Sequence, residues 1–305
     1  MSRTPSLRRT TVQAMACAAI VVSVLVSARA AVAQTSTMLK TDNAVANARL
    51  TPRVDIAVSP PVVLPPSGMA WTGLYVGGIV GLGNGTADVA TTVQQGAFPL
   101  YFATSSVTSI NTNGAATITP KKSPFGGEVG FNAQAGGAFF GAEGDFSSLK
   151  FSDSHSVTVI YPCCAPTQYT LKQSIATNWL ITVRGRGGVN LGRALVYGTA
   201  GLAWIDLDYE ALFTETFANG TETGSINKKQ SALVWGGGAE FRGGKHWSVK
   251  GEFLTADFSH GTPFTTTSTN LATTTGGAAT WPNDKFTHST TFKMNVIRGG
   301  INFGF

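Results

Sequence analysis

Charge, cysteine and long apolar runs are all scarce in this sequence. Only 12% of its 305 residues are charged, and three are cysteines. From Gln34 onward, no apolar run reaches the roughly 20 residues that a membrane-spanning helix needs. These absences exclude a disulfide-framework protein and a helical membrane protein.

A large positive charge is also absent once the N-terminus is set aside. The whole chain carries a formal charge of +6, but residues 1–33 contain four arginines and no acid, which leaves +2 for the remainder. No clustered basic face is apparent, so we expect no nucleic-acid partner.

Residues 1–33 have the features of a secretory signal peptide. Arg3, Arg8 and Arg9 precede an apolar stretch at 12–26, which closes on the A-x-A site Ala31-Val32-Ala33. The protein is therefore expected to be exported.

Residues 34–70 lack apolar periodicity and end in two proline-rich pieces, Ser59-Pro60-Pro61 and Pro65-Pro66-Ser67-Gly68. That composition predicts an extended, poorly ordered periplasmic linker. A wall-binding arm is the alternative, although the segment is too short and too plain for a folded domain.

The remaining residues, 71–305, alternate in polarity with the period of a strand. We expect eight strands, at residues 71–83, 125–134, 138–151, 175–189, 194–206, 231–242, 247–258 and 290–305. In the first, the even positions from Leu74 to Leu82 are apolar or glycine. The fifth is the least regular, because Leu195 and Ile205 fall on the face opposite Val196 and Leu202.

The connections between these strands alternate in length. Four long links, at 84–124, 152–174, 207–230 and 259–289, alternate with three tight, glycine-containing ones at 135–137, 190–193 and 243–246. Residues 264–280 have the composition of a mobile loop. The second long link contains adjacent cysteines, Cys163 and Cys164, which form either a strained vicinal disulfide or two free thiols.

A closed barrel is the way to span a membrane without apolar helices, because its strands satisfy every backbone hydrogen bond between neighbours. Parity alone does not say which face lies inside, so a soluble barrel is the alternative. The apolar face, however, carries aromatic residues near strand ends, as interfacial girdles do: Trp71, Trp179, Trp235, Phe241, Trp247, Phe303 and Phe305. The predicted fold is therefore all-β, an eight-stranded antiparallel up-and-down transmembrane β-barrel with short periplasmic turns and long outer loops.

Charged residues share the opposite parity on six of the strands. They comprise five acids and four bases: Glu128, Glu143, Asp145, Arg184, Arg186, Glu240, Lys250, Glu252 and Arg298. In a barrel this narrow, such side chains would meet in the lumen and have to pair. We interpret them as a salt-bridged plug, with a gated ion path as the alternative.

Catalytic and metal sites are not indicated. The four histidines, His155, His246, His260 and His288, lie in or beside predicted loops and turns, outside any nucleophile motif or metal-ligand spacing. We expect no cofactor and no enzyme, although lipid-modifying outer-membrane enzymes remain a less favoured alternative.

Several motifs in order along residues 71–305 carry a family resemblance. They are Trp71-Thr72-Gly73-Leu74-Tyr75-Val76-Gly77-Gly78, Gly141-Ala142-Glu143-Gly144-Asp145-Phe146, Val183-Arg184-Gly185-Arg186-Gly187-Gly188, Tyr197-Gly198-Thr199-Ala200-Gly201-Leu202-Ala203, Trp235-Gly236-Gly237-Gly238-Ala239-Glu240, Lys250-Gly251-Glu252-Phe253-Leu254 and residues 296–305. These resemble the small, porin-like outer-membrane surface antigens of alphaproteobacteria, related to the OmpA-type barrel. The long loops do not visibly match that pattern.

The resemblance implies a surface-exposed protein of the Gram-negative outer membrane, serving envelope integrity, adhesion or as an antigen, with a narrow porin-like channel as the alternative. The expected partners are outer-membrane lipid and lipopolysaccharide, the barrel assembly machinery, and an extracellular ligand contacted through the loops. The terminal Phe305, on an alternating strand, resembles the signal that the assembly machinery recognises.

Overall fold

The computed structural model describes residues 71–96, 101–260, 263–268 and 284–304. The predicted signal peptide, the predicted linker and the predicted assembly signal Phe305 lie outside the described residues.

Strands dominate the described chain. The elements are β1 (Gly73–Gln94), α2 (Thr104–Asn113), β2 (Ala115–Ile118), β3 (Lys121–Lys122), β4 (Phe125–Ala135), β5 (Ala138–Ile160), β6 (Gln168–Asn190), β7 (Ala194–Glu215), β8 (Thr221–Arg242), β9 (Trp247–Asp257), β10 (Phe264–Ser268), β11 (Lys285–Thr290) and β12 (Lys293–Gly304). No described helix is long and apolar enough to cross a membrane.

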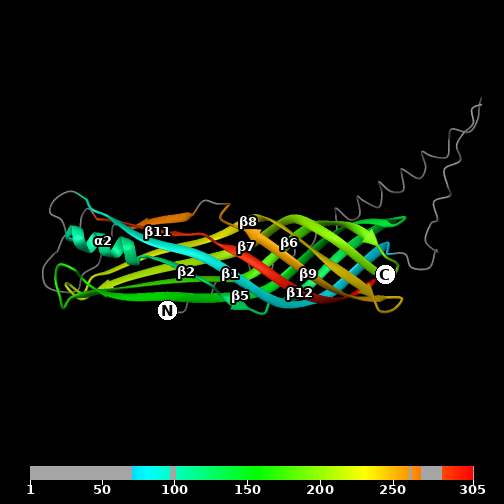
Figure 1. Cartoon of the computed structure of the whole chain (residues 1–305), viewed down its shortest axis with the longest axis horizontal. Coiled ribbons are helices and arrows are strands. Elements are labelled where there is room, and N and C mark those ends of the chain that lie inside the picture. Colours follow the sequence, from blue (N-terminus) through cyan, green and yellow to red (C-terminus); the bar gives the residue numbers. More distant parts are fainter. Residues whose placement is uncertain (1–70, 97–100, 261–262, 269–283, 305) are drawn as a thin grey trace, which may run out of the picture.

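Eight of these strands form a closed ring. Each of β4 to β8 pairs antiparallel with the next strand, β9 pairs with β12, and β1 pairs with both β12 and β4. The result is an elongated up-and-down barrel, with the tight turns and the end of β12 at one end and α2 at the other (Figure 1). This confirms the predicted fold class.

The half of the barrel nearest the tight turns has an apolar outer surface. Along β1, Val76, Val80 and Leu82 are exposed, whereas Tyr75 and Ile79 are buried inside. The alternation follows from the pleat, which sends successive side chains to opposite faces. A lipid-facing belt of this kind is what a membrane barrel requires.

One aromatic residue that was predicted to face the membrane lies inside instead. Trp71 is 5% exposed, and its indole nitrogen donates to the carbonyl of Gly192. It shares the inward parity of Tyr75, so it closes the end of the barrel rather than joining the girdle. Trp235 and Trp247, in contrast, are exposed on the outer face.

Five of the eight predicted strands, those at 71–83, 138–151, 175–189, 194–206 and 231–242, are too short at the end away from the tight turns. β5, for example, has 23 residues, whereas crossing a membrane takes about 9–11. In these extensions the apolar side chains point inward: on β7, Ile205, Leu207 and Phe213 are fully buried. The apolar parity therefore reverses along one strand, which is why the fifth predicted segment looked irregular.

The predicted long links also contain regular structure. Residues 84–124 include α2, β2 and β3, and residues 259–289 include β10 and most of β11. The expected mobile loop at 264–280 is wrong for its first part, because β10 pairs with β11. These short strands extend the barrel wall by adding to β1 and β11.

The barrel interior is filled in layers. Next to the tight turns lies a small apolar cluster that includes Trp71 and Phe139. A large apolar cluster in the middle includes Phe151, Phe258 and Phe292. A third, aromatic cluster at the far end includes Ile110 of α2. Between the first two clusters lie the charged residues.

Candidate functional site

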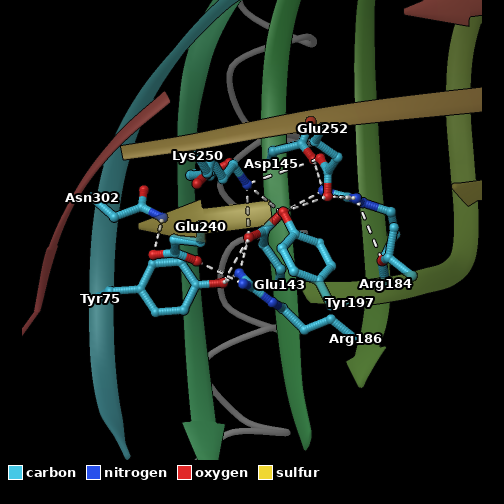
Figure 2. Close-up of polar contacts among 12 residues, drawn as sticks. Tyr75, Glu143, Asp145, Arg184, Arg186, Tyr197, Glu240, Lys250, Glu252 and Asn302 are labelled. Atoms are coloured by element: carbon cyan, nitrogen blue, oxygen red, sulfur yellow. Dashed lines mark hydrogen bonds and ion pairs between the residues drawn. The ribbon is translucent and has the colours of Figure 1, made fainter. Parts of the chain in front are cut away.

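The structure places all nine predicted lumen charges inside the barrel. Each is 5% exposed or less, and they come from β4, β5, β6, β8, β9 and β12. Figure 2 shows most of them converging from opposite walls, with tyrosines between them. Alternation explains their common direction, but only closure of the ring brings β5 and β6 opposite β9 and β12.

Glu143 lies at the centre of this charge network. Its carboxylate pairs with Arg184, with Arg186 at 2.9 Å and with Lys250 at 2.9 Å. The hydroxyl of Tyr75 donates to the same carboxylate at 2.6 Å (Figure 2). Arg298 lies 3.7 Å from the same carboxylate. One acid is thus shared by four cations, so its loss would leave several of them uncompensated at once.

A second group lies on the side of the network toward the middle of the barrel. Arg184 pairs with Asp145 at 3.0 Å and with Glu252 at 2.9 Å, and Arg298 pairs with the same two acids at 2.9 and 2.7 Å. The Thr182 hydroxyl donates to Asp145. These contacts join the walls on both sides of the lumen.

The third group lies toward the tight turns. Arg186 donates to Glu240 at 2.6 Å, and its guanidinium stacks 4.2 Å from the centre of the Tyr197 ring. Ser248 and Asn302 also donate to Glu240. The guanidinium is thereby held between a carboxylate and an aromatic face.

The network has one acid more than it has bases. Glu128 is the least supported acid: among the described residues, its one ion pair is with Lys250, at 2.6 Å, and neither of its oxygens is in hydrogen-bonding geometry. Glu128 also lies directly opposite Asp145 in the β4–β5 register. Glu128 is therefore the acid of the network with the fewest stabilising contacts.

Sequence reasoning missed the uncharged polar members of the network described above: Tyr75, Thr182, Tyr197, Ser248 and Asn302. Each lies on the inward parity of its strand and is no more than 6% exposed. That parity was the available signal, but uncharged residues did not stand out among the many polar positions.

The middle apolar cluster separates the charge network from the outer end. Val296 and Leu254 lie two residues beyond Arg298 and Glu252 on β12 and β9, and both are buried. Phe151, in the same apolar cluster, is 1% exposed. The network is consequently enclosed by apolar side chains on its outer side.

A second buried polar group lies farther out. His288 on β11 is fully buried; its Nδ1 is 2.8 Å from the Thr91 hydroxyl and its Nε2 is 3.0 Å from Glu222. The expected loop position of His288 is therefore wrong, because β11 continues the wall. Gly224 leaves the space for this ring, since a Cβ there would lie 2.2 Å from the imidazole.

The outer end carries a shallow cavity of about 100 Å³. Tyr101, Phe102, Phe217 and the bonded pair Cys163–Cys164 line it. Of the two states left open for the cysteines, the structure has the vicinal disulfide. Burial and the neighbouring Glu215 carboxylate raise the pKa of Tyr101, so its hydroxyl stays protonated and donates to Glu215.

A larger cavity, of about 210 Å³, opens at the tight-turn end. The residues that line it include Glu240, Arg242, Lys245 and Trp247. Within the described residues, no group of three or more histidine, cysteine or acidic side chains is placed to hold a metal ion.

Comparison with known proteins gives a consistent result. A sequence model of the family described as "outer membrane protein beta-barrel domain" matches residues 62–295. The "31 kDa outer-membrane immunogenic protein" of Brucella melitensis biotype 1 is 26% identical over 208 residues, which cover 65% of this chain and 76% of that protein.

Two solved structures were also found to be similar. OprG from Pseudomonas aeruginosa is 13% identical, with 77% of this chain and 97% of that chain covered and a TM-score of 0.34. The outer-membrane protease OmpT from Escherichia coli is 8% identical, with 76% and 97% covered and a TM-score of 0.38.

Proposed function

This chain belongs to the outer membrane protein beta-barrel domain family, and within that family we propose that it is a closed, non-conducting surface protein whose outer end is a recognition surface. It is a protein of the Gram-negative outer membrane, and the tight turns face the periplasm. The biological roles that fit are envelope integrity, adhesion or surface antigen.

The filled interior is the observation that carries this proposal. An ion passing through the barrel would meet the middle apolar cluster, where Phe151, Phe258 and Phe292 are at most 1% exposed. Beyond it, α2 covers the outer end, and Ile110 is fully buried among aromatic rings. Moving an ion through such apolar surroundings without partners costs several kcal/mol.

The alternative, a narrow channel, would use the charged residues as an ion path. Their mutual pairing favours a structural role, because each of the four cations already contacts two or more carboxylates; Lys250, for example, pairs with Glu128 and Glu143. Such a network holds opposite walls of the barrel in register.

The outer end supports the recognition role. Its strands extend well beyond the lipid-facing belt, and the disulfide, Tyr101 and the 65%-exposed Phe217 form an apolar cavity there. Rigid strands that carry such features outside the cell suit binding of an extracellular ligand. The Brucella relative is named for being immunogenic.

We do not propose a catalytic function. Thr91, His288 and Glu222 are hydrogen-bonded in the order that a hydrolytic nucleophile, base and acid would take. All three are at most 1% exposed, however, and neither of the two larger cavities is lined by them. Such burial among the described residues favours a structural role for this group in the outer half of the barrel.

Planar-bilayer conductance of the refolded protein tests the proposal. We expect no steady current above that of the lipid alone, from protein whose faster migration on an unboiled gel shows that it is folded. Arg184→Gln and the outer-surface control Lys172→Gln are measured alongside. Steady wild-type currents would contradict the closed barrel. If their ion selectivity changed in Arg184→Gln but not in Lys172→Gln, the protein would be a channel that uses the charged residues as its ion path.

A further inference from the structure

The lipid-facing belt has a well-defined outer boundary on the β1–β4–β5 side of the barrel. Leu82, Phe125 and Phe146 are exposed there by 69%, 59% and 48%. Beyond this level the outward positions become polar, as Asn84 and Ser148 show. The headgroups of the outer leaflet lie at such a boundary.

Three lysines stand immediately outside this boundary on adjoining strands. On β3, Lys121 lies opposite Asn84 and Lys122 opposite Gly83, the next positions after Leu82 on β1. β3 also lies beside β5, where Lys150 follows two residues after Ser148. All three lysine side chains are exposed.

The backbone of β5 is arranged to present Lys150. A bulge interrupts the β5–β6 register between Ser148 and Phe151, and Lys150 has a φ of 49°. Left-handed backbone is unusual for a residue other than glycine, asparagine or aspartate. Bulges of this kind redirect a side chain, and here Leu149 and Phe151 both remain buried while Lys150 points out.

These lysines have no carboxylate partner among the described residues. Lys250 and Lys293 form ion pairs, but Lys121, Lys122 and Lys150 form none. The acids on the same strands lie farther out along β1 and β5; Asp88, for instance, accepts a hydrogen bond from Thr117. These three exposed lysines therefore place uncompensated positive charge on adjoining strands just outside the lipid-facing belt.

We propose that Lys121, Lys122 and Lys150 bind the phosphate groups of the outer-leaflet lipid, the lipid A part of lipopolysaccharide. Charge complementarity supports this occupant, because ammonium groups form charge-assisted hydrogen bonds with phosphate oxygens. Continuity supports it too, since the acyl chains of the same lipid lie against Leu82, Phe125 and Phe146 directly below. This site does not depend on whether the barrel conducts.

The test is a titration of the refolded protein with diphosphorylated lipid A in zwitterionic micelles, with bound lipid counted by native mass spectrometry. The variant carries Lys121→Gln, Lys122→Gln and Lys150→Gln. We expect binding to weaken by roughly tenfold to 100-fold, since each lysine near an anionic lipid surface contributes about fivefold. Lipid A without its phosphates, which keeps the acyl chains, should bind both proteins weakly and equally.

A matched control carries Lys172→Gln, Lys228→Gln and Lys285→Gln, three exposed lysines on other parts of the outer strands. It has the same net charge as the test variant and should bind lipid A as the wild type does. Equal losses in both triple variants, or no preference of the wild type for phosphorylated lipid A, would overturn the proposal. Equally tight binding of phosphatidylglycerol would show that the site takes any phospholipid rather than the outer-leaflet lipid.

Discussion

At the scale of single residues, deep burial makes the charge network dependent on every partner. Arg184 contacts three carboxylates, those of Glu143, Asp145 and Glu252, and its side chain has no exposed surface. A cation in this position stabilises the fold only while those contacts persist, because water cannot solvate the buried carboxylates in its place.

We therefore predict that Arg184→Ala lowers the free energy of unfolding by about 3–5 kcal/mol, the usual effect of breaking a buried ion pair. Lys172→Ala, on the outer surface, should change it by less than about 0.5 kcal/mol. Urea unfolding in micelles, followed by tryptophan fluorescence, measures both. Equal effects of the two substitutions would mean that the network does not stabilise the barrel.

The acids of the network should differ from one another. Glu143 pairs with four cations and accepts from Tyr75, whereas Glu128 pairs with Lys250 alone. Glu128→Gln also removes the one acid in excess of the bases. We predict that Glu143→Gln lowers the unfolding midpoint much more than Glu128→Gln, measured under the same urea conditions. The reverse order would contradict the pairing described above.

At the scale of elements, the reversal of apolar parity along β7 shows how the surroundings determine which face of a strand carries the apolar residues. Near the tight turns, Val196 and Leu202 face lipid; toward the outer end, Ile205 and Phe213 face inward. The strand itself does not change. What changes is the medium outside, from hydrocarbon to water, so the apolar face becomes the inner one.

α2 should detach and unfold locally, independently of the barrel. It contacts the wall through the buried Ile110 and through Ser109, whose hydroxyl lies 2.9 Å from that of Tyr169. The rest of the helix is largely exposed. We therefore predict that Ile110→Ala lowers the free energy of local opening of α2 by roughly 2–5 kcal/mol, the usual effect of a buried Ile→Ala change. Proteolysis and amide exchange of α2 should increase accordingly. The unfolding of the barrel should be unaffected.

The control for that experiment is Ser105→Ala, at an exposed position of the same helix. It should leave both proteolysis and amide exchange as in the wild type. Simultaneous loosening of the β strands in Ile110→Ala would show that α2 is part of the barrel's cooperative unit instead.

At the scale of the whole molecule, closure decides whether the barrel can exist in a membrane. The ring closes through β1, which pairs with β12 on one side and β4 on the other. An unpaired edge in hydrocarbon would leave backbone groups unsatisfied, at several kcal/mol each. The last strand is therefore essential to the fold as a whole.

Assembly in the cell should depend on the end of that strand. Phe305 lies outside the described residues, and its role as an assembly signal stays a prediction from the sequence. We predict that deleting Phe305 sharply reduces the amount of protein assembled in the outer membrane, whereas refolding of the purified protein into detergent suffers much less. Comparing the two yields, for the deletion and for Phe305→Ala, measures this. Normal cellular assembly of both variants would mean that the aromatic terminus only anchors the strand at the interface.

The sequence alone determined the eight-stranded barrel and the parity of its charged residues. Alternation of polarity is a local property, and so is the difference between a tight glycine turn and a long link; both can be read along the chain. The nine lumen charges and the adjacent cysteines were identified in this way.

Only the tertiary structure decided the rest. The outward extension of the strands, the burial of His288 against Thr91 and Glu222, and the position of α2 over the outer end depend on contacts between distant segments. The pairing of Glu143 with Lys250 joins residues 107 positions apart. A linear pattern assigns a side chain to one of two faces, but which face is inside, and what it meets there, is set by ring closure and by the change from lipid to water along the barrel.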